Sequence, residues 1–141
     1  MQVGSFFALI SPKEIKATIN ALKERFPEKR FVLIFQPHQY ERTKLLFDDF
    51  VKSFNGVDIL VLTEIFEVKG REAKKDISAK DLKETLQSFW QKTGKKGKVF
   101  FVKKKNLEDF LKKILQKKDL VVLMGAGDID EKRENLKKIK I

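Results

Sequence analysis

The side chains with the clearest chemical potential in this sequence lie close together, just after residue 36. His38, Tyr40, Arg42 and Thr43 fall within one short polar stretch. An imidazole, a phenol, a guanidinium and a hydroxyl can all donate hydrogen bonds, and the guanidinium also carries a permanent positive charge. This combination favours an anionic ligand, such as a phosphate or a carboxylate.

The elements on either side of this stretch indicate where it lies in the fold. The apolar run Phe31–Phe35 precedes it and predicts a buried strand, which Gln36 and Pro37 end. The amphipathic pattern that follows predicts a helix from about residue 42 to residue 54. The polar stretch therefore lies at the carboxyl end of a strand, which is where open α/β sheets bind ligands.

Two further loops follow predicted strands and are expected to reach the same edge of the sheet. One runs from Thr63 and Glu64 through residues 70–72, and the other contains Gly125, Ala126, Gly127 and Asp128. Glycine lets backbone amides approach a ligand closely, and amides at the start of a helix favour an anion. A Gly-Ala-Gly turn can equally be a tight strand-to-helix connection. It matches neither a dinucleotide-binding fingerprint nor a P-loop.

Other classes of site find little support. The chain has one histidine and no cysteine, so it offers no histidine pair and no thiolate for a metal. No serine nucleophile lies at a sensible spacing from a base, so we predict neither a catalytic residue nor a metal ligand. Simpler roles stay open, because His38 could bond within its own loop and Arg42 could pair with Glu41 or Asp48. The Asp48–Asp49 pair fits a solvated helix face.

Helical and strand patterns alternate along the whole chain. Helices are predicted to begin at Ser11–Pro12, Ser78 and Asn106, with a short one after Asp128, and the first ten residues could add an edge strand. Strands are predicted at residues 31–35, 57–63, 99–102 and 120–124. Helical crossovers between strands require a parallel sheet, and continuously apolar strands indicate helices on both faces. We therefore predict one α/β domain over residues 1–141, with three layers and a mainly parallel sheet.

The composition fits a globular domain with a basic surface. Of 141 residues, 42% are hydrophobic, and the formal net charge is +11. A basic binding module for an anionic partner such as nucleic acid is one interpretation, but base recognition usually relies on arginine, and lysine dominates here. A solvated lysine-rich surface explains the charge better. No segment is long and apolar enough to span a membrane and no leader is evident, so we expect a cytoplasmic protein.

Several motifs together resemble a known family. In order and spacing they are similar to the C-terminal domain of the Mur ligases, most closely of the UDP-N-acetylmuramate–L-alanine ligases, and the resemblance covers about residues 12–138. The segments that carry it are 12–18, 35–43, 62–65, 70–72 and 125–129. The stretch Phe-Gln-Pro-His-x-Tyr-x-Arg-Thr at residues 35–43 is the most specific of them.

This resemblance implies a Rossmann-like fold and a part in peptidoglycan synthesis. Enzymes of the family use ATP and Mg to form an acyl-phosphate and then an amide bond, and here the substrates would be UDP-N-acetylmuramate and L-alanine. By position, His38 and Arg42 would face the amino-acid carboxylate and the reaction centre. Tyr40 and Thr43 would support that loop, and residues 125–128 would line the nucleotide side of the cleft.

The sequence also departs from the family pattern. Family members carry Asp-Asp-Tyr-x-His-His-Pro before the first helix, whereas residues 6–12 here read Phe-Phe-Ala-Leu-Ile-Ser-Pro, so residues 1–11 form a diverged segment. Gln39 stands where a second arginine is usual. No Gly-x-x-x-x-Gly-Lys-Ser/Thr motif occurs, so ATP and Mg would be held mainly by a domain outside this chain. We expect the chain alone not to ligate; it could instead complete a separately encoded P-loop partner.

Overall fold

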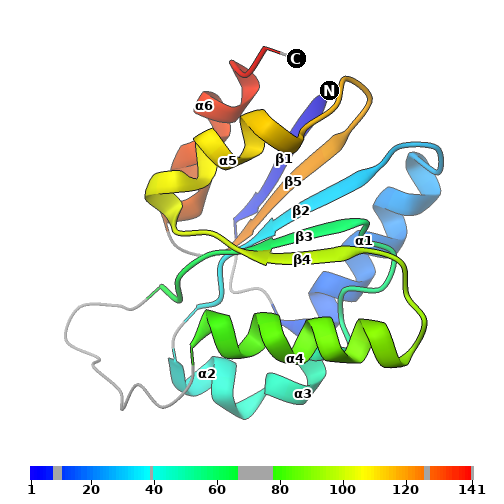
Figure 1. The fold of residues 1–141 in the computed structure, drawn as a ribbon, viewed down its shortest axis with the longest axis vertical. Helices are drawn as coiled ribbons and strands as arrows, with labels where there is room; N and C mark the ends of the chain where they lie inside the picture. The colour runs from blue at the N-terminus through cyan, green and yellow to red at the C-terminus, as the bar shows by residue number, and fades with distance from the viewer. Residues whose placement is uncertain (8–10, 39, 67–77, 126–127, 141) are drawn as a thin grey trace.

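The computed structural model describes residues 1–7, 11–38, 40–66, 78–125 and 128–140. Its centre is a five-stranded parallel sheet in the order β1-β5-β2-β3-β4 (Figure 1). The strands are β1 (Gln2–Phe7), β2 (Phe31–Phe35), β3 (Ile59–Leu62), β4 (Lys98–Phe101) and β5 (Leu120–Gly125). The helices are α1 (Pro12–Arg25), α2 (Tyr40–Leu45), α3 (Phe47–Val51), α4 (Ala79–Lys92), α5 (Leu107–Ile114) and α6 (Arg133–Lys137), with 3-10 helices η1 (Lys104–Asn106) and η2 (Asp128–Lys132).

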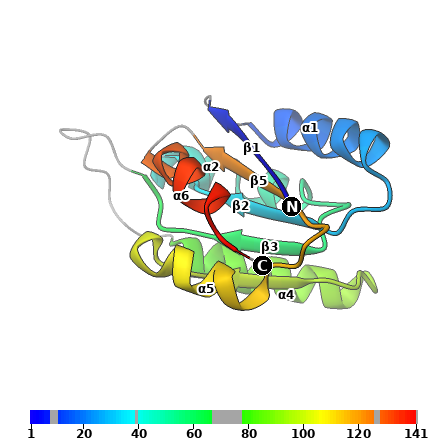
Figure 2. The same cartoon turned by 90° about the horizontal axis from the view of Figure 1, so that it is seen from above.

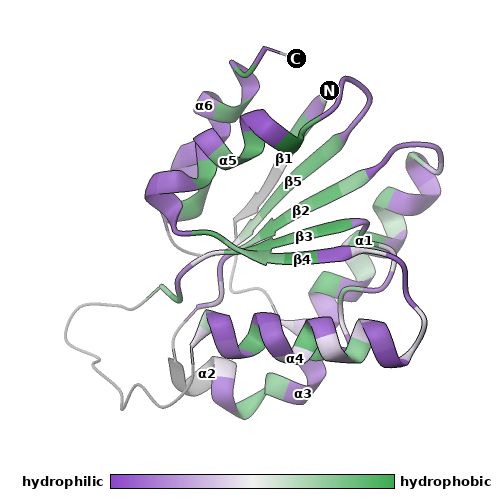
Figure 3. Cartoon of the chain, in the orientation of Figure 1, coloured by the Kyte–Doolittle hydropathy of each residue, from purple (hydrophilic) through white to green (hydrophobic). Residues whose placement is uncertain are grey.

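Helices cover both faces of the sheet, as the apolar strands predict. Helices α1, α3 and α4 pack on one face, and α5, η2 and α6 pack on the other (Figure 1). Strand residues alternate between the two cores: Leu33 faces the first and Ile34 the second. Figure 3 shows the resulting pattern, with apolar strands inside and hydrophilic residues on the outer helix surfaces. The predicted three-layer α/β fold is confirmed.

The first residues do form an edge strand. Strand β1 pairs in parallel with β5 along its whole length, from Gln2 opposite Leu120 to Phe7 opposite Gly125. Helix α6 returns to lie beside β1, which both Figure 1 and Figure 2 show. The diverged segment thus completes one side of the sheet. Among the described residues, no helix has the length and apolar composition needed to cross a membrane.

Two helix starts follow their predicted caps. The hydroxyl of Ser11 accepts a hydrogen bond from the Glu14 amide at 3.2 Å, with Pro12 in the first turn. Ser78 and Asp81 form a reciprocal capping box at the start of α4, in which the Ser78 amide donates to Asp81 at 2.8 Å. These caps satisfy backbone amides that have no partner within the helix.

Asn106 is the N-cap residue of α5, as predicted, but its side chain makes no cap hydrogen bond, because η1 forms the turn before the helix and places Asn106 in a helical conformation. One local prediction is wrong: the helix predicted over residues 42–54 is divided into α2 and α3, with Leu46 between them. Phe50 and Phe54 pack in the core beside Phe35.

Candidate functional site

The ends of β2 and β5 lie side by side at the carboxyl edge of the sheet. Phe35 is in register with Met124, and the Gln36 amide donates to the Met124 carbonyl at 2.9 Å. The loop that contains His38 and the turn that starts at Gly125 therefore leave the sheet from neighbouring positions. The predicted convergence of these two loops holds for the backbone.

Polar side chains connect the loops that follow four strands, and we call Gln36, Glu64, Lys104 and Asp128 the carboxyl-edge network. The Lys104 ammonium contacts both carboxylate oxygens of Asp128 at 2.7 Å. The Gln36 side chain donates to Asp128 at 2.9 Å and accepts from the Ile129 amide at 3.2 Å. The Glu64 carboxylate accepts from the Lys104 amide at 2.6 Å. The network fixes the relative positions of the loops after β2, β3, β4 and β5.

The network also determines the ionisation of Asp128. Partial burial alone would raise the pKa of this carboxyl group, but the hydrogen bonds from Lys104 and Gln36 and the charge of Lys104 outweigh it. The pKa of Asp128 is therefore lowered, and the carboxylate is ionised at neutral pH. The charge of Lys104 thus compensates the negative charge of Asp128.

Gly125 is required at the end of β5 by close packing. A Cβ atom at this position would lie 2.8 Å from Cγ2 of Ile129 and 3.1 Å from Cβ of Gln36. Both distances are shorter than ordinary van der Waals contacts, and the Gln36 carbonyl oxygen is also near, at 3.2 Å. The absence of a side chain at Gly125 therefore lets the end of β5 approach Gln36. This packing requirement does not depend on any ligand.

The loop after β2 pairs with the segment after β3. His38 forms an isolated parallel bridge with Phe66, their rings stack at a centroid distance of 5.6 Å, and the Phe66 amide donates to the Pro37 carbonyl at 2.8 Å. His38 is only partly buried, whereas Thr43 is fully buried. The roles of His38 as a ligand contact and of Thr43 as a support for the loop stay predictions.

The other predicted site residues are described in part or not at all. Tyr40 and Arg42 lie in α2 by their backbone, and their side chains are outside the described part of the structure. Ala126, Gly127 and residues 70–72 also lie outside the described residues. Their roles stay predictions. Within the described ranges, no group of three or more acidic or histidine side chains could hold a metal ion.

The sequence alone did not identify Lys104 as a residue that connects the loops of the site. This lysine belongs to the run Lys103-Lys104-Lys105, which in the sequence indicates only a charged surface. Its partner Asp128 lies 24 residues further along the chain, so no local pattern connects the two. Gln36 carried a better signal, because it belongs to the specific Phe-Gln-Pro-His stretch.

Comparison with known proteins identifies the family of this fold. Residues 11–127 match the family model described as "Mur ligase, glutamate ligase domain". UDP-N-acetylmuramate–L-alanine ligases are among the similar curated proteins. The one from Neisseria meningitidis is 40% identical over 119 residues, and the one from a Geobacter species is 37% identical over 118 residues. Each alignment covers 84% of this chain and 24% of the relative, so the chain spans about a quarter of their length.

Solved structures agree with this assignment. A UDP-N-acetylmuramate–alanine ligase from Thermotoga maritima superposes with a TM-score of 0.63 at 25% identity, covering 94% of this chain and 25% of that one. A murein peptide ligase from Psychrobacter arcticus gives a TM-score of 0.67 at 18% identity, over 96% of this chain and 27% of the other, and shares the fold. The chain belongs to the Mur ligase family, and it matches the glutamate ligase domain of that family.

Proposed function

We propose that this chain acts as the C-terminal domain of an ATP-dependent ligase that joins L-alanine to UDP-N-acetylmuramate in the cytoplasm. The observation that carries the proposal is the convergence of the His38 loop and the Gly125 turn at one edge of the sheet, within a chain of this family. The relatives whose printed name gives this reaction are 37% to 40% identical to it. Under the proposal, the carboxyl edge faces the reaction centre.

The residues at this edge have chemistry suited to that position. Arg42 would bind the carboxylate of the incoming amino acid, and its positive charge would also favour an adjacent acyl-phosphate. His38 would donate a hydrogen bond to the same reactants, with Thr43 beneath the loop as a buried support. ATP and Mg supply the activated phosphate when bound, and the turn from Gly125 to Asp128 would lie against the nucleotide.

The proposal assigns most nucleotide contacts to residues outside this chain. The sequence has no P-loop motif, and residues 1–11 lack the acidic and histidine residues that the family pattern places there. The described part of that segment, β1, pairs with β5 and thereby supports the strand that ends at Gly125. The role proposed for residues 1–11 is therefore structural, within a single domain that spans residues 1–141.

Two activity measurements test the proposal together. The chain alone, mixed with ATP, Mg, UDP-N-acetylmuramate and L-alanine, should release no phosphate above the blank. A chimera in which it replaces the C-terminal domain of the Neisseria meningitidis ligase should release phosphate only when both UDP-N-acetylmuramate and L-alanine are present. The truncated ligase without a C-terminal domain is the baseline.

Variants of the chimera locate the function at the proposed edge. H38A and R42A should each lower kcat/KM for L-alanine by at least about tenfold, the effect of losing one charged or hydrogen-bonding contact. K16E, on the exposed surface of α1, should leave it unchanged. A folded chimera no more active than the truncated ligase, or equal loss in all three variants, would refute the proposal.

A further inference from the structure

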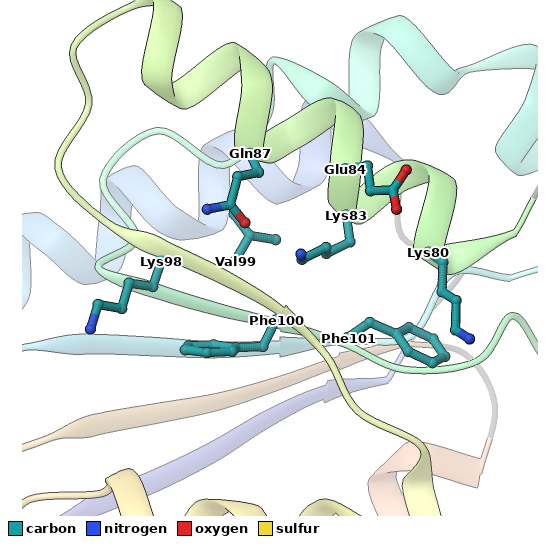
Figure 4. A pocket seen from close by; sticks show the side chains of 8 residues that line it. All are labelled: Lys80, Lys83, Glu84, Gln87, Lys98, Val99, Phe100 and Phe101. Atoms are coloured by element: carbon teal, nitrogen blue, oxygen red, sulfur yellow. The ribbon is translucent and has the colours of Figure 1, made fainter.

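The sheet has an open lateral edge along β4, whose lining residues are not part of the carboxyl-edge network. Among the described residues, β4 pairs only with β3, so its other side has no neighbouring strand. A groove of about 550 Å³ runs along this edge between β4 and α4, and Figure 4 shows the side chains around it. Its lining residues are Lys80, Lys83, Glu84, Gln87, Lys98, Val99, Phe100 and Phe101.

The backbone of this edge is oriented to accept another strand. The amides of Lys98 and Val102 donate to carbonyls of the β3 side, at 3.1 Å and 2.9 Å. Since successive residues of a strand point their backbone groups to opposite sides, Val99 and Phe101 direct their N–H and C=O groups away from β3. These groups are the ones that an added strand would pair with.

The side chains of the groove combine an apolar floor with positive charge. Val99 and Phe101 belong to the core on the α4 side, whereas Phe100 packs against Phe110 on the opposite face at a centroid distance of 5.1 Å. The groove therefore wraps around the edge and contacts both faces. The ammonium of Lys80 lies 5.6 Å from the centre of the Phe101 ring, and Lys83 and Lys98 add further positive charge against the single carboxylate of Glu84.

This charge determines which extended segment can bind. A second copy of β4 would bring the lysines of its own groove towards Lys80, Lys83 and Lys98, and like charges brought together are unfavourable. An acidic segment would instead place its carboxylates beside Lys80, Lys83 and Lys98. The groove follows a strand edge rather than a broad surface, which favours a single extended chain over a helix or a nucleic acid.

We propose that the β4 edge binds an acidic, extended peptide segment as an additional strand. The segment pairs its backbone with Val99 and Phe101, and alternate carboxylates contact the lysines of the groove. Val99 is buried and lines the groove together with Lys83 and Gln87, so strand pairing at Val99 requires these two long side chains to move aside. This site uses none of the residues of the carboxyl-edge network, so it stands or falls independently of the ligase assignment.

NMR titration of the isolated chain with a capped peptide of alternating glutamate and valine, (Glu-Val)₃, tests the proposal. Addition of the peptide should shift the amide signals of Val99 and Phe101 and slow their hydrogen exchange. Raising the salt concentration to about 0.5 M should weaken the binding, because exposed charges are then strongly screened. The K80E/K83E variant should bind about tenfold more weakly, since two attractive pairs become repulsive.

Matched controls separate this mode from simple charge attraction. K13E/K16E, which changes two exposed lysines on α1, should bind the peptide as the unmodified chain does. The same (Glu-Val)₃ peptide methylated on every backbone amide nitrogen keeps the charge but has no N–H groups for strand pairing, and it should bind at least about tenfold more weakly. Equal binding of the methylated peptide, (Lys-Val)₃ or a short oligothymidine at this edge, or no shift at Val99 and Phe101, would overturn the proposal.

Discussion

Lys104 connects three loops of the carboxyl-edge network through its side chain and its backbone amide. Its ammonium binds Asp128, which follows β5, and its backbone amide binds Glu64, which follows β3. Asp128 in turn binds Gln36, which follows β2. Four residues thereby link the loops after four strands, in addition to the His38–Phe66 bridge between the loops after β2 and β3. We interpret Lys104 as a positioning residue, since it acts through Asp128.

Replacing Lys104 tests this interpretation at the residue scale. K104M keeps the length of the side chain but removes its charge, which leaves Asp128 with Gln36 alone. The free energy of unfolding should fall by about 1 kcal/mol, a modest loss because both side chains are partly exposed. K105M changes the neighbouring exposed lysine and should have no measurable effect in urea denaturation. An equal effect of both variants would contradict the role given to Lys104.

The lowered pKa of Asp128 predicts a pH dependence of the same network. A carboxyl group with a lowered pKa in the folded state stabilises the protein above its unfolded pKa, about 3.9 for aspartate. That stabilisation is lost as the pH falls through the lower value of the folded state. D128N should therefore be less stable than the unmodified chain at pH 7, and the difference should shrink below pH 4. A difference in unfolding free energy that is constant with pH would show that Asp128 stabilises the fold without its charge.

At the scale of elements, the end of β5 depends on a residue without a side chain. G125A should lower the free energy of unfolding by about 1–3 kcal/mol, because the added methyl group overlaps Ile129 and Gln36. Gly4 provides a matched control on β1, since a Cβ there meets no atom within 4 Å. G4A should change the midpoint of thermal unfolding little. The prediction fails if G4A destabilises the chain as much as G125A does.

At the opposite edge of the sheet, an ion pair joins Arg30 to the buried carboxylate of Asp119. Arg30 precedes β2 and donates to Asp119, which precedes β5, through two bonds of 2.8 Å and 2.6 Å, and also to the Ile114 carbonyl at the end of α5. Asp119 is 1% exposed, and the pairing raises the pKa of Arg30. This pair joins two central strands and one helix far from the proposed reaction centre.

R30M should be strongly destabilising, because it leaves the Asp119 carboxylate buried without its counter-charge. Breaking such a pair by removing one partner typically costs about 3–5 kcal/mol. R25M, at an exposed position on α1, should cost far less. Chemical denaturation of the two variants provides the comparison. A small loss in R30M would mean that Gln116, whose amide also donates to Asp119, suffices to satisfy the carboxylate.

The sequence predicted the elements well wherever burial decides the pattern. Phe31–Phe35 is an apolar run because helices cover both faces of β2, and its bounds agree with the structure. The error falls where a local turn interrupts a predicted helix, near Leu46. That outcome depends on how the chain packs onto its core, which residue types alone do not specify.

The candidate site was predictable only in outline. Strand order brings the loops after β2 and β5 together, and the sequence supports that convergence because both strands are parallel and buried. The contacts between Lys104, Glu64 and Asp128 join residues far apart in the chain, so spacing gives no sign of them. The requirement for Gly125 likewise arises from packing against Gln36 rather than from the turn itself.

At the scale of the whole molecule, the two ends of the sheet and its open lateral edge have different roles. The amino edge holds the Arg30–Asp119 pair, the carboxyl edge carries the predicted ligand-binding residues, and β4 leaves one side open. With a formal net charge of +11, the domain would also attract anionic molecules generally. The central claim is narrower: in a complete ligase, the carboxyl edge faces the reactants.

Hydrogen exchange in the chimeric ligase tests that claim most directly. Exchange is followed by mass spectrometry with and without UDP-N-acetylmuramate, L-alanine and a non-hydrolysable ATP analogue. We predict slower exchange in peptides that contain Gln36 and His38 and in those that contain Gly125 and Asp128. Peptides around Arg30 and Asp119 should exchange unchanged. Protection confined to the Arg30–Asp119 edge, or no protection at the carboxyl edge in a chimera that turns over, would contradict the account.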